Sequence, residues 1–127
     1  MKEVMAIIRP NAVAKTMKAL EVVGFPAATV LECFGRGKQM GYITVNFPEE
    51  VNVEKVIKEG EEKGLKMRYI PKRMLSIVVD DADVPLVVGI ISKINRTGKF
   101  GDGKIFVIPT EEAVRIRTGE TGTSAVN

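Results

Sequence analysis

The chain has 127 residues, of which 45% are hydrophobic and 28% are charged, and its formal net charge is +3. These values are typical of a soluble globular protein, and we take residues 1–127 as a single domain. Histidine is absent, which excludes phosphohistidine chemistry and every nucleophile that depends on an imidazole base. The one cysteine, Cys33, permits no internal disulfide and supplies too few ligands for a zinc site, and we expect a cytoplasmic protein.

Two classes of partner are not expected from the charge and hydropathy patterns. The basic residues are scattered among acidic ones and have no aromatic platform beside them, which argues against nucleic-acid binding. The longest apolar run, 85–91, is far shorter than the roughly 20 residues that span a bilayer, so no membrane insertion is expected. The N-terminal residues also lack the pattern of a signal peptide.

The first part of the chain predicts a strand, a helix and a second strand. Residues 3–9 form a short apolar run that Pro10 ends, and 27–33 form another run with strand character. Between them, Asn11 is a suitable N-cap and Gly24 a suitable end for a helix. The apolar residues of that helix recur at helical spacing: Val13, Met17, Leu20 and Val23.

A long excursion follows the second strand. Residues 34–41 are rich in glycine and basic side chains, and 42–47 alternate like an exposed strand before Pro48. Residues 49–64 are strongly charged, and their apolar positions allow at most two helical turns after an Asn52 cap. Such a charge run usually lies on the surface, and we predict a solvated segment.

The second half repeats the pattern of the first. Residues 72–79 predict a strand, and the aspartates within 80–83 place negative charge at the N-terminus of the next helix. Residues 104–108 predict a further strand and 113–117 a last short one, before a polar tail. The helix has an apolar stripe at i, i+3, i+4 and i+7, formed by Val87, Ile90, Ile91 and Ile94.

This order is β-α-β, an excursion, then β-α-β, which is the split βαβ arrangement (βαββαβ) of the ferredoxin-like α+β fold. An antiparallel four-stranded sheet with both helices on one face satisfies it. The strands carry apolar side chains at alternate positions on both sides, so the second face of the sheet needs a cover. We therefore expect the chain to oligomerise.

Residues 97–107, Thr-Gly-Lys-Phe-Gly-Asp-Gly-Lys-Ile-Phe-Val, form the most distinctive stretch of the chain. Glycine allows positive φ and close approach of a ligand to the backbone, and successive N–H groups in such turns bind anions. Lys99 and Lys104 add charge that suits phosphate. The same residues also fit a helix C-cap at Gly98 followed by a Gly-Asp-Gly turn into a strand, and chemistry alone leaves both interpretations open.

The order of residues in this stretch resembles the C-terminal signature of the PII nitrogen-regulatory protein family, in which the loop holds the phosphates of ATP or ADP. The resemblance extends over 1–41 and 71–120. It implies a ferredoxin-like protomer in a trimer, with a T-loop at about 37–71, a nucleotide-phosphate loop at 97–104 and a C-terminal loop at 115–127. The other matching segments are Arg115-Ile116-Arg117-Thr118-Gly119-Glu120, Ala6-Ile7-Ile8-Arg9-Pro10 and Gly35-Arg36-Gly37-Lys38-Gln39.

The resemblance also implies a nucleotide site in the cleft between adjacent subunits. The two arginines of the C-terminal segment are expected to share one strand face, where an anion would relieve their repulsion; exposure to solvent is the alternative. The residues implied for ATP or ADP are Ile7, Thr29 and Val78 around the base, Thr97, Gly101, Asp102, Gly103 and Lys104 at the phosphates, and Arg115 and Arg117 from the neighbouring subunit.

Gly35, Gly37 and Gln39 match the start of the family's T-loop. The family's glutamine ligates Mg²⁺ on ATP and helps to form the 2-oxoglutarate site, and its lysine at the far base of the loop matches Lys72. Mg²⁺ takes oxygen ligands in octahedral geometry, largely from phosphates. One amide oxygen from Gln39 therefore leaves room for a chelating 2-oxo acid, whose second carboxylate Lys72 would neutralise. Without the resemblance, Gln39 is an ordinary polar loop residue and Lys72 a strand-edge charge.

Three departures from the family pattern bear on function. Ser76 stands where the family has an acidic residue near the ribose. The tyrosine that bacterial members carry at the tip of the T-loop has no counterpart, and Tyr42 and Tyr69 lie at the base instead. The excursion is also longer than in the usual member. These features resemble the archaeal PII-like proteins encoded among nitrogenase genes, specifically the longer of two subunit types, which act on nitrogenase and are relieved by 2-oxoglutarate.

The resemblance therefore implies a non-catalytic signal protein that binds ATP, ADP and 2-oxoglutarate and regulates nitrogenase through its T-loop. The implied partners are further copies of the chain or a sister PII-like subunit, and the dinitrogenase component of nitrogenase. Regulation of an ammonium transporter or of another nitrogen-assimilation target is the alternative.

Two other classes of function are less favoured. A small nucleotide-using enzyme on the same fold needs a positioned base or nucleophile, and the carboxylates of 49–62 show no paired spacing for an acid/base dyad. A simple amino-acid-binding module would not explain why several basic residues are expected to converge on one cleft. Those residues are Lys99, Lys104, Arg115 and Arg117.

Overall fold

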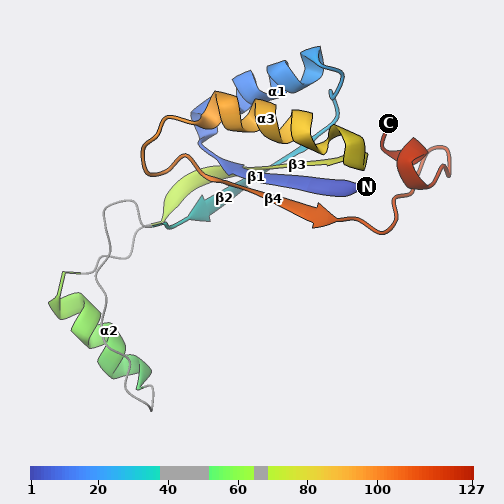
Figure 1. Ribbon diagram of the computed structural model, residues 1–127. Coiled ribbons are helices and arrows are strands. Elements are labelled where there is room, and N and C mark those ends of the chain that lie inside the picture. The colour runs from blue at the N-terminus through green and yellow to red at the C-terminus, as the bar shows by residue number, and fades with distance from the viewer. Residues whose placement is uncertain (38–51, 65–68) are drawn as a thin grey trace.

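The structure is a computed structural model that describes residues 1–37, 52–64 and 69–127. Helices α1 (Val13–Val22) and α3 (Val84–Asn95) lie side by side over one face of a single sheet (Figure 1). This is the predicted ferredoxin-like α+β arrangement. The sheet is antiparallel in the order β2-β3-β1-β4, and its strands are β1 (Lys2–Ile8), β2 (Thr29–Gly35), β3 (Ile70–Val79) and β4 (Lys104–Pro109).

Alternation along the central strands turns one face of the sheet towards the helices. In β1, Val4, Ala6 and Ile8 are buried, whereas the residues between them are partly exposed. Their burial against α1 and α3 favours folding by roughly 25 cal/mol for each Å² of apolar surface removed from water. The core consists of Val4, Ala6, Ile8, Leu20, Leu75, Ile77, Val79, Val87 and Ile91.

A buried polar contact joins the two helices. The Asn95 side-chain amide donates to Thr16 Oγ1 at 3.0 Å and to the Ile91 carbonyl at 2.9 Å. The Thr16 hydroxyl donates in turn to the Ala12 carbonyl at 2.7 Å. Because a buried polar group without a partner costs about 1–3 kcal/mol, these bonds remove a penalty at the helix contact. Asn95 also ends α3, so the contact anchors the start of the glycine-rich loop.

One predicted helix boundary, the Asn11 cap, is wrong, and the alternative interpretation of Gly98 as a C-cap does not hold. Asn11 does not cap α1: it lies in a 3₁₀ turn, Pro10–Ala12, and Ala12 is the N-cap without a side-chain hydrogen bond. The ring of Pro10 fixes a φ that suits the first turn, so the helical path starts earlier than expected. Gly98 does not cap α3, which ends at Asn95 because Arg96 is extended at φ −74° and ψ 119°.

The predicted strand at 113–117, within the described part of the chain, is also wrong. Only Val114 pairs there, in an isolated antiparallel bridge with Thr121. The Arg115 N–H donates to the Glu120 carbonyl at 2.9 Å, and the Gly119 N–H donates to the Arg115 carbonyl at 2.7 Å. The backbone is therefore satisfied by a local turn, and the expected common strand face for the two arginines does not form.

The described part of the excursion is a helix, α2 (Val53–Glu62), which projects away from the sheet and the other two helices (Figure 1). The predicted Asn52 cap is confirmed, since its side chain accepts from the Lys55 N–H at 3.1 Å. With 10 residues, α2 is longer than the two turns predicted. Opposite charges four residues apart, as at Glu54 and Lys58, favour the extra turn.

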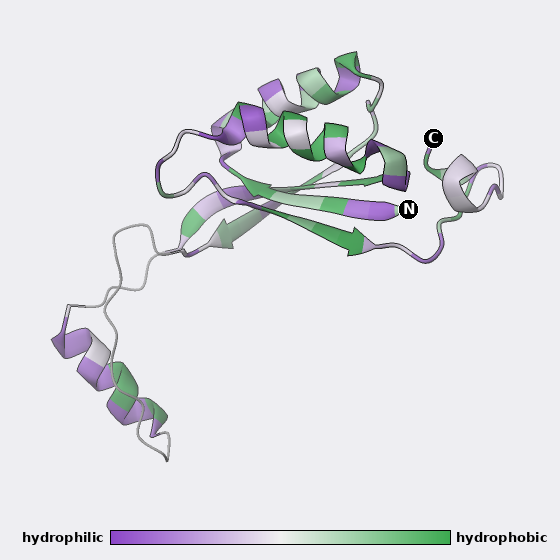
Figure 2. Cartoon of the chain, viewed as in Figure 1, coloured by the Kyte–Doolittle hydropathy of each residue, from purple (hydrophilic) through white to green (hydrophobic). Residues whose placement is uncertain are grey.

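Polar residues dominate α2, and its apolar side chains gather towards one end (Figure 2). Val53 and Ile57 are 62% and 53% exposed. The prediction of a solvated segment is confirmed for this helix, whereas the predicted strand at 42–47 lies outside the described residues. Among the helices that the structure describes, none has the length and apolar character needed to span a membrane.

The face of the sheet opposite α1 and α3 has no helix over it in the described part of the chain (Figure 1). The strand register places Leu31 and Phe106 on this helix-free face, where they are 54% and 48% exposed. Exposed large apolar side chains that gather on one surface are typical of an interface. The expected trimer remains a prediction that this face supports.

Candidate functional site

The loop between α3 and β4, residues 97–103, is bent at three glycines with positive φ. The angles are +82° at Gly98, +97° at Gly101 and +100° at Gly103. Residues with a Cβ pay roughly 1–2 kcal/mol in left-handed conformations, so the path of the loop depends on these positions. The predicted use of glycine for backbone geometry is confirmed.

Gly103 meets a second constraint that Gly98 does not. A Cβ at Gly103 would lie 1.8 Å from the Ile7 carbonyl oxygen, whereas a Cβ at Gly98 would meet nothing within 4 Å. The loop therefore packs directly on the backbone of β1, and the next residue, Lys104, pairs with Ile7 in the sheet. Gly103 therefore allows the loop to pack on β1, whereas Gly98 is needed only for the backbone conformation of the bend.

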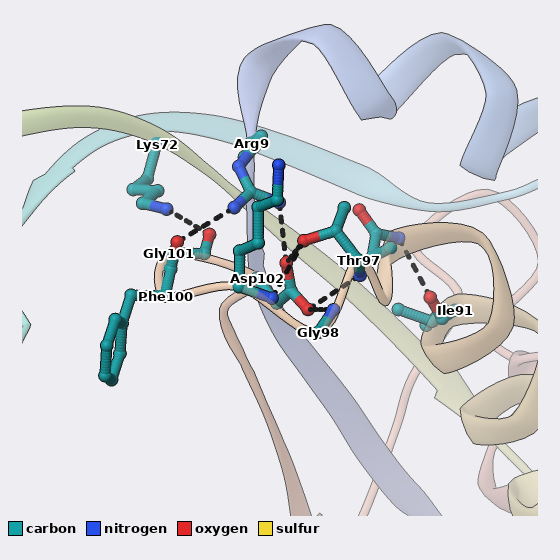
Figure 3. Close-up of polar contacts among 10 residues, drawn as sticks. Arg9, Lys72, Ile91, Thr97, Gly98, Phe100, Gly101 and Asp102 are labelled. Carbon is teal, nitrogen blue, oxygen red and sulfur yellow. Dashed lines mark hydrogen bonds and ion pairs between the residues drawn. The ribbon is translucent and has the colours of Figure 1, made fainter. Parts of the chain in front are cut away.

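The Asp102 carboxylate organises the loop from inside (Figure 3). Its Oδ2 accepts from the backbone N–H groups of Thr97 at 2.7 Å and Gly98 at 2.9 Å. Its Oδ1 accepts from the Thr97 hydroxyl and from Arg9 Nη1, the latter at 2.8 Å. The Thr97 hydroxyl and Arg9 hold the pKa of Asp102 far below its ordinary value of 3.8. The side chain is thus committed to the loop, where it occupies the N–H groups of Thr97 and Gly98.

Arg9, which directly follows β1, holds the loop at two points. Nη1 pairs with Asp102, and Nη2 donates to the Phe100 carbonyl at 3.1 Å (Figure 3). The guanidinium is partly buried, and charge-assisted bonds of this kind are stronger than neutral ones. No role for Arg9 is predicted from the sequence, although the residue lies in one of the segments that carry the family resemblance.

Lys72 connects the loop to the far base of the excursion. Its Nζ donates to the Gly101 carbonyl at 2.6 Å, and the residue is only 6% exposed (Figure 3). Burial lowers the pKa of Lys72 from its ordinary 10.5, and the nearby Arg9 lowers it further, while Asp102 offsets part of the shift. The alternative interpretation of Lys72 as a strand-edge charge does not fit, because its ammonium donates to the loop.

The residues implied for the nucleotide base share the helix-free face of the sheet. The register pairs Ile7 with Lys104 and with Met74, and places Thr29 and Val78 on the same face. Because paired residues point to one side, this face runs from the loop across three strands. Ile7 and Val78 are half-buried and Thr29 is exposed, so the surface is open to a ligand or a neighbouring chain.

A carboxylate lies beside the position where an acidic residue is missing. The Ser76 hydroxyl donates to Glu3 Oε2 at 2.6 Å, on the helix-free face. Glu3 comes from β1 and Ser76 from β3, which are paired in the sheet. The sequence shows the loss of the acidic residue at Ser76, and strand alternation alone places Glu3 on the same side as Ile7, but the contact between Glu3 and Ser76 was not predicted.

The C-terminal arginine is engaged with its own tail. Arg115 Nη1 pairs with Glu120 Oε1 at 3.1 Å. Arg115 Nη2 donates to the carbonyls of Ser124 at 3.1 Å and Asn127 at 2.7 Å. The segment lies at the opposite end of β4 from the glycine-rich loop (Figure 1). A strand of this length spans roughly 20 Å, so Arg115 cannot reach the loop of its own chain.

The sequence matches the family model of the nitrogen regulatory protein P-II over residues 1–120. The chain belongs to the PII family. It is 71% identical over 126 residues to "Nitrogen fixation nifHD region GlnB-like protein 2" of Methanothermococcus thermolithotrophicus, covering 99% of this chain and 98% of the relative. A protein of the same name from Methanothermobacter marburgensis is 52% identical over 126 residues, which cover 99% of this chain and 100% of the relative.

In this PII chain, the predicted site residues fall into three groups. The loop residues Thr97, Gly101, Asp102 and Gly103 are brought together with Lys72. The sheet residues Ile7, Thr29, Val78 and Lys104 continue the surface on the helix-free face, and Gly35 pairs with Ile70 at the end of β2. Arg115 and Arg117 lie at the far end of the chain's own sheet.

Two predicted site residues belong to none of these groups. Gly37 is exposed beyond β2. Gln39, predicted for both Mg²⁺ and 2-oxoglutarate, lies outside the described residues.

The expected convergence of four basic residues on one cleft is not seen within one PII chain. Lys104 lines a depression next to Asp102 and Gly103, whereas Lys99 lines a different one beside Arg9. Lys104 also sits on the sheet, where its register is fixed by β1, while Lys99 belongs to the loop itself. Only a neighbouring chain could bring the C-terminal arginines near Lys104.

Proposed function

We propose that this PII protein binds ATP or ADP together with 2-oxoglutarate and reports their levels through its T-loop. The observation that carries the proposal is the bond from Lys72 Nζ to the Gly101 carbonyl. It joins the base of the T-loop, where Lys72 lies in β3, to the loop expected to hold phosphate. A ligand that engages either end changes the contacts of the other, which is what a signal protein requires.

The nucleotide is expected to bind between subunits. The bent loop offers backbone N–H groups, and Lys104 adds a charge on the same face as the half-buried Ile7 and Val78. Arg115 and Arg117 of an adjacent chain would complete the phosphate contacts in a closed trimer. Glu3 takes the place of the acidic residue absent at Ser76, since its carboxylate already accepts a hydrogen bond there and can accept one from a ribose hydroxyl.

The 2-oxoglutarate site would be formed by Lys72 and Gln39. An ammonium group has three N–H donors, and Lys72 uses one of them for Gly101, so two remain for a carboxylate. Mg²⁺ held by the phosphates and Gln39 would supply a chelation point for the 2-oxo acid. A dicarboxylate would also compensate the buried charge of Lys72, whose pKa burial lowers.

We further propose that the regulated partner is the dinitrogenase component of nitrogenase, bound when 2-oxoglutarate is low and released when it is high. The relatives named for nifHD regions support this assignment over an ammonium transporter, the second candidate. The exposed Val53 and Ile57 of α2 give the T-loop an apolar contact surface. A mixed trimer with a sister PII-like subunit is compatible with the same interface.

Calorimetry with ATP, ADP and 2-oxoglutarate, each with and without Mg²⁺, tests ligand binding directly. We expect 2-oxoglutarate to bind only when Mg²⁺ and ATP are both present, and Gln39→Ala to abolish that binding while sparing ADP. Lys72→Met should also abolish it. The matched control is Arg73→Met, because Arg73 is adjacent but pairs with Glu32 on the other side of β3. Equal 2-oxoglutarate binding without Mg²⁺ contradicts the chelation site.

A pull-down with ATP present tests the partner. Immobilised protein should retain dinitrogenase from an extract, and added 2-oxoglutarate should release it. Capture of an ammonium transporter in its place favours the second candidate. Capture that ignores 2-oxoglutarate contradicts a sensor role for either partner, because a ligand shifts an equilibrium only through its differential affinity for two states.

A further inference from the structure

A basic depression lies on the helix side of the molecule, between the start of α1 and the loop that follows α3. Its volume is about 440 Å³. Three of its lining residues are cationic, Arg9, Lys15 and Lys99, and none is acidic. Side chains of one charge sign around a hollow focus the electrostatic field and raise the local concentration of counter-ions.

Each of the three cationic side chains has N–H donors that make no hydrogen bond with the described part of the chain. Neither Lys15 nor Lys99 uses its ammonium group in a hydrogen bond or ion pair with the part of the chain that the structure describes. Arg9 spends two bonds on the loop, to Asp102 and Phe100, and a guanidinium has five N–H donors. The side chain of Asn11 adds a neutral amide to the lining.

This depression adjoins the proposed nucleotide site, with which it shares Thr97, but its lining also includes Asn11 and Lys15 from the start of α1. A second hollow, of about 270 Å³, lies beside Lys104 on the helix side of the sheet, where Ile8, Val88 and Ile91 line it. Asp102 and Gly103 line this second hollow but not the basic depression. Asn95 is the one residue common to both linings. Lys104 and the predicted base-binding residues lie on the helix-free face, whereas Lys15 comes from α1, which covers the other face.

We propose that the basic depression is a second anion site, which binds a multivalent oxyanion of the phosphate class. Arg9 is already paired with Asp102, whereas the ammonium groups of Lys15 and Lys99 have no acidic partner in the described part of the chain. A phosphate group would supply that partner and accept several charge-assisted hydrogen bonds at once. The concave shape favours a small anion over the flat acidic surface of another macromolecule. The inference does not depend on nucleotide binding at the loop.

Titration with inorganic pyrophosphate, followed by amide NMR at ionic strength matched with sodium chloride, tests the site. The amides of Asn11 and Lys15 report on it, because both belong to the α1 side and not to the glycine-rich loop. We expect saturable shifts at both. The double variant Lys15→Gln/Lys99→Gln should weaken this binding by about tenfold or more, since two charge-assisted contacts are lost.

Two further variants separate the possible outcomes. Lys18→Gln removes an exposed lysine of the same helix that does not line the depression, and it should leave the titration unchanged. Lys104→Gln should also leave the Asn11 and Lys15 shifts unchanged. Shifts that vanish in Lys104→Gln but survive in the double variant overturn the proposal, because the anion then occupies the loop alone. Shifts reproduced by sodium chloride overturn it as well, since they reflect screening.

Discussion

The glycine-rich loop and the C-terminal segment are both expected to hold phosphate, yet they are held in different ways. The loop is fixed by contacts from the body of its own chain: Arg9 and Lys72 bind its carbonyls and Asp102 spans its ends. Arg115 instead spends its guanidinium on Glu120 and the last residues of the chain. The glycine-rich loop of the proposed cleft is thus preorganised. In the C-terminal segment, Arg115 must break its contacts with the tail before it can bind a ligand.

This difference between the loop and the C-terminal segment indicates which of them reduces the free energy of binding. A preorganised loop spends little conformational entropy when a phosphate arrives. When a segment must break three existing contacts before it binds, their loss offsets part of the binding free energy that the new contacts contribute. We therefore expect substitutions in the loop to have large effects, and substitutions in the tail to have small ones of opposite sign.

The largest effect is expected from Gly103→Ala. The added methyl group would lie 1.8 Å from the Ile7 carbonyl oxygen, so the loop must leave the sheet. We expect a loss of stability on the order of 3 kcal/mol and no measurable ATP binding, from the clash combined with backbone strain. Gly98→Ala is the matched control: it has positive φ but open space, and about 1 kcal/mol should be lost. Urea unfolding and calorimetry measure both; equal costs for the two variants contradict the packing argument.

Lys104→Ala comes next. The side chain lies on the helix-free face of the sheet, where the nucleotide is proposed to bind. Its removal should weaken ATP and ADP alike by about 1.5–3 kcal/mol, the worth of a charge-assisted contact. The fold should persist, because Lys104 is exposed. Lys18→Ala controls for the loss of one positive charge. Calorimetry that finds unchanged affinity for both nucleotides would mean that the loop is purely structural.

The pH dependence of the loop is expected to follow Asp102. The Thr97 hydroxyl and Arg9 lower its pKa in the folded protein, so its contribution to stability is fully present above the ordinary value of 3.8 and declines as the pH falls towards the lower folded value. Amide exchange at Thr97 and Gly98, whose N–H groups bind the carboxylate, should stay slow at pH 5 and rise in strong acid. Asp102→Asn should show faster exchange already at neutral pH. Loss of protection as the pH falls through 6, measured against the exchange rate of the unfolded chain at the same pH, would contradict this assignment.

The smallest effect is expected at the tail. Glu120→Gln weakens one of the contacts that occupy Arg115, and removal of 121–127 takes away the Ser124 and Asn127 carbonyls. Each change should raise ATP affinity by about two- to fivefold, since exposed ion pairs are worth roughly 0.2–1 kcal/mol. Glu111→Gln is the control, because Glu111 is exposed and is not among the residues that contact Arg115. A loss of affinity on tail removal would show that the tail assists the ligand.

Features that depend on neighbouring residues could be predicted from the sequence, whereas contacts between distant residues could not. Local rules sufficed for the four strands and for α1 and α3, because alternation and helical spacing are properties of neighbouring residues. They failed at 113–117, where apolar and basic residues alternate like a strand but Gly119, at φ +73°, lets the backbone close on itself. The glycine geometry of the loop followed from composition, whereas the roles of Arg9 and Glu3 needed contacts between residues distant in sequence.

The central claim is that each nucleotide site takes its loop from one chain and its arginines from the next. Mixing Lys104→Ala chains with Arg115→Ala chains, after unfolding and refolding together, tests it most directly. Each variant alone should bind ATP weakly. In a mixed ring, an intact loop meets an intact arginine at a single interface, so calorimetry should detect high-affinity ATP binding at about one site per mixed trimer. Mixed assemblies that bind no better than either parent would contradict a site shared between chains.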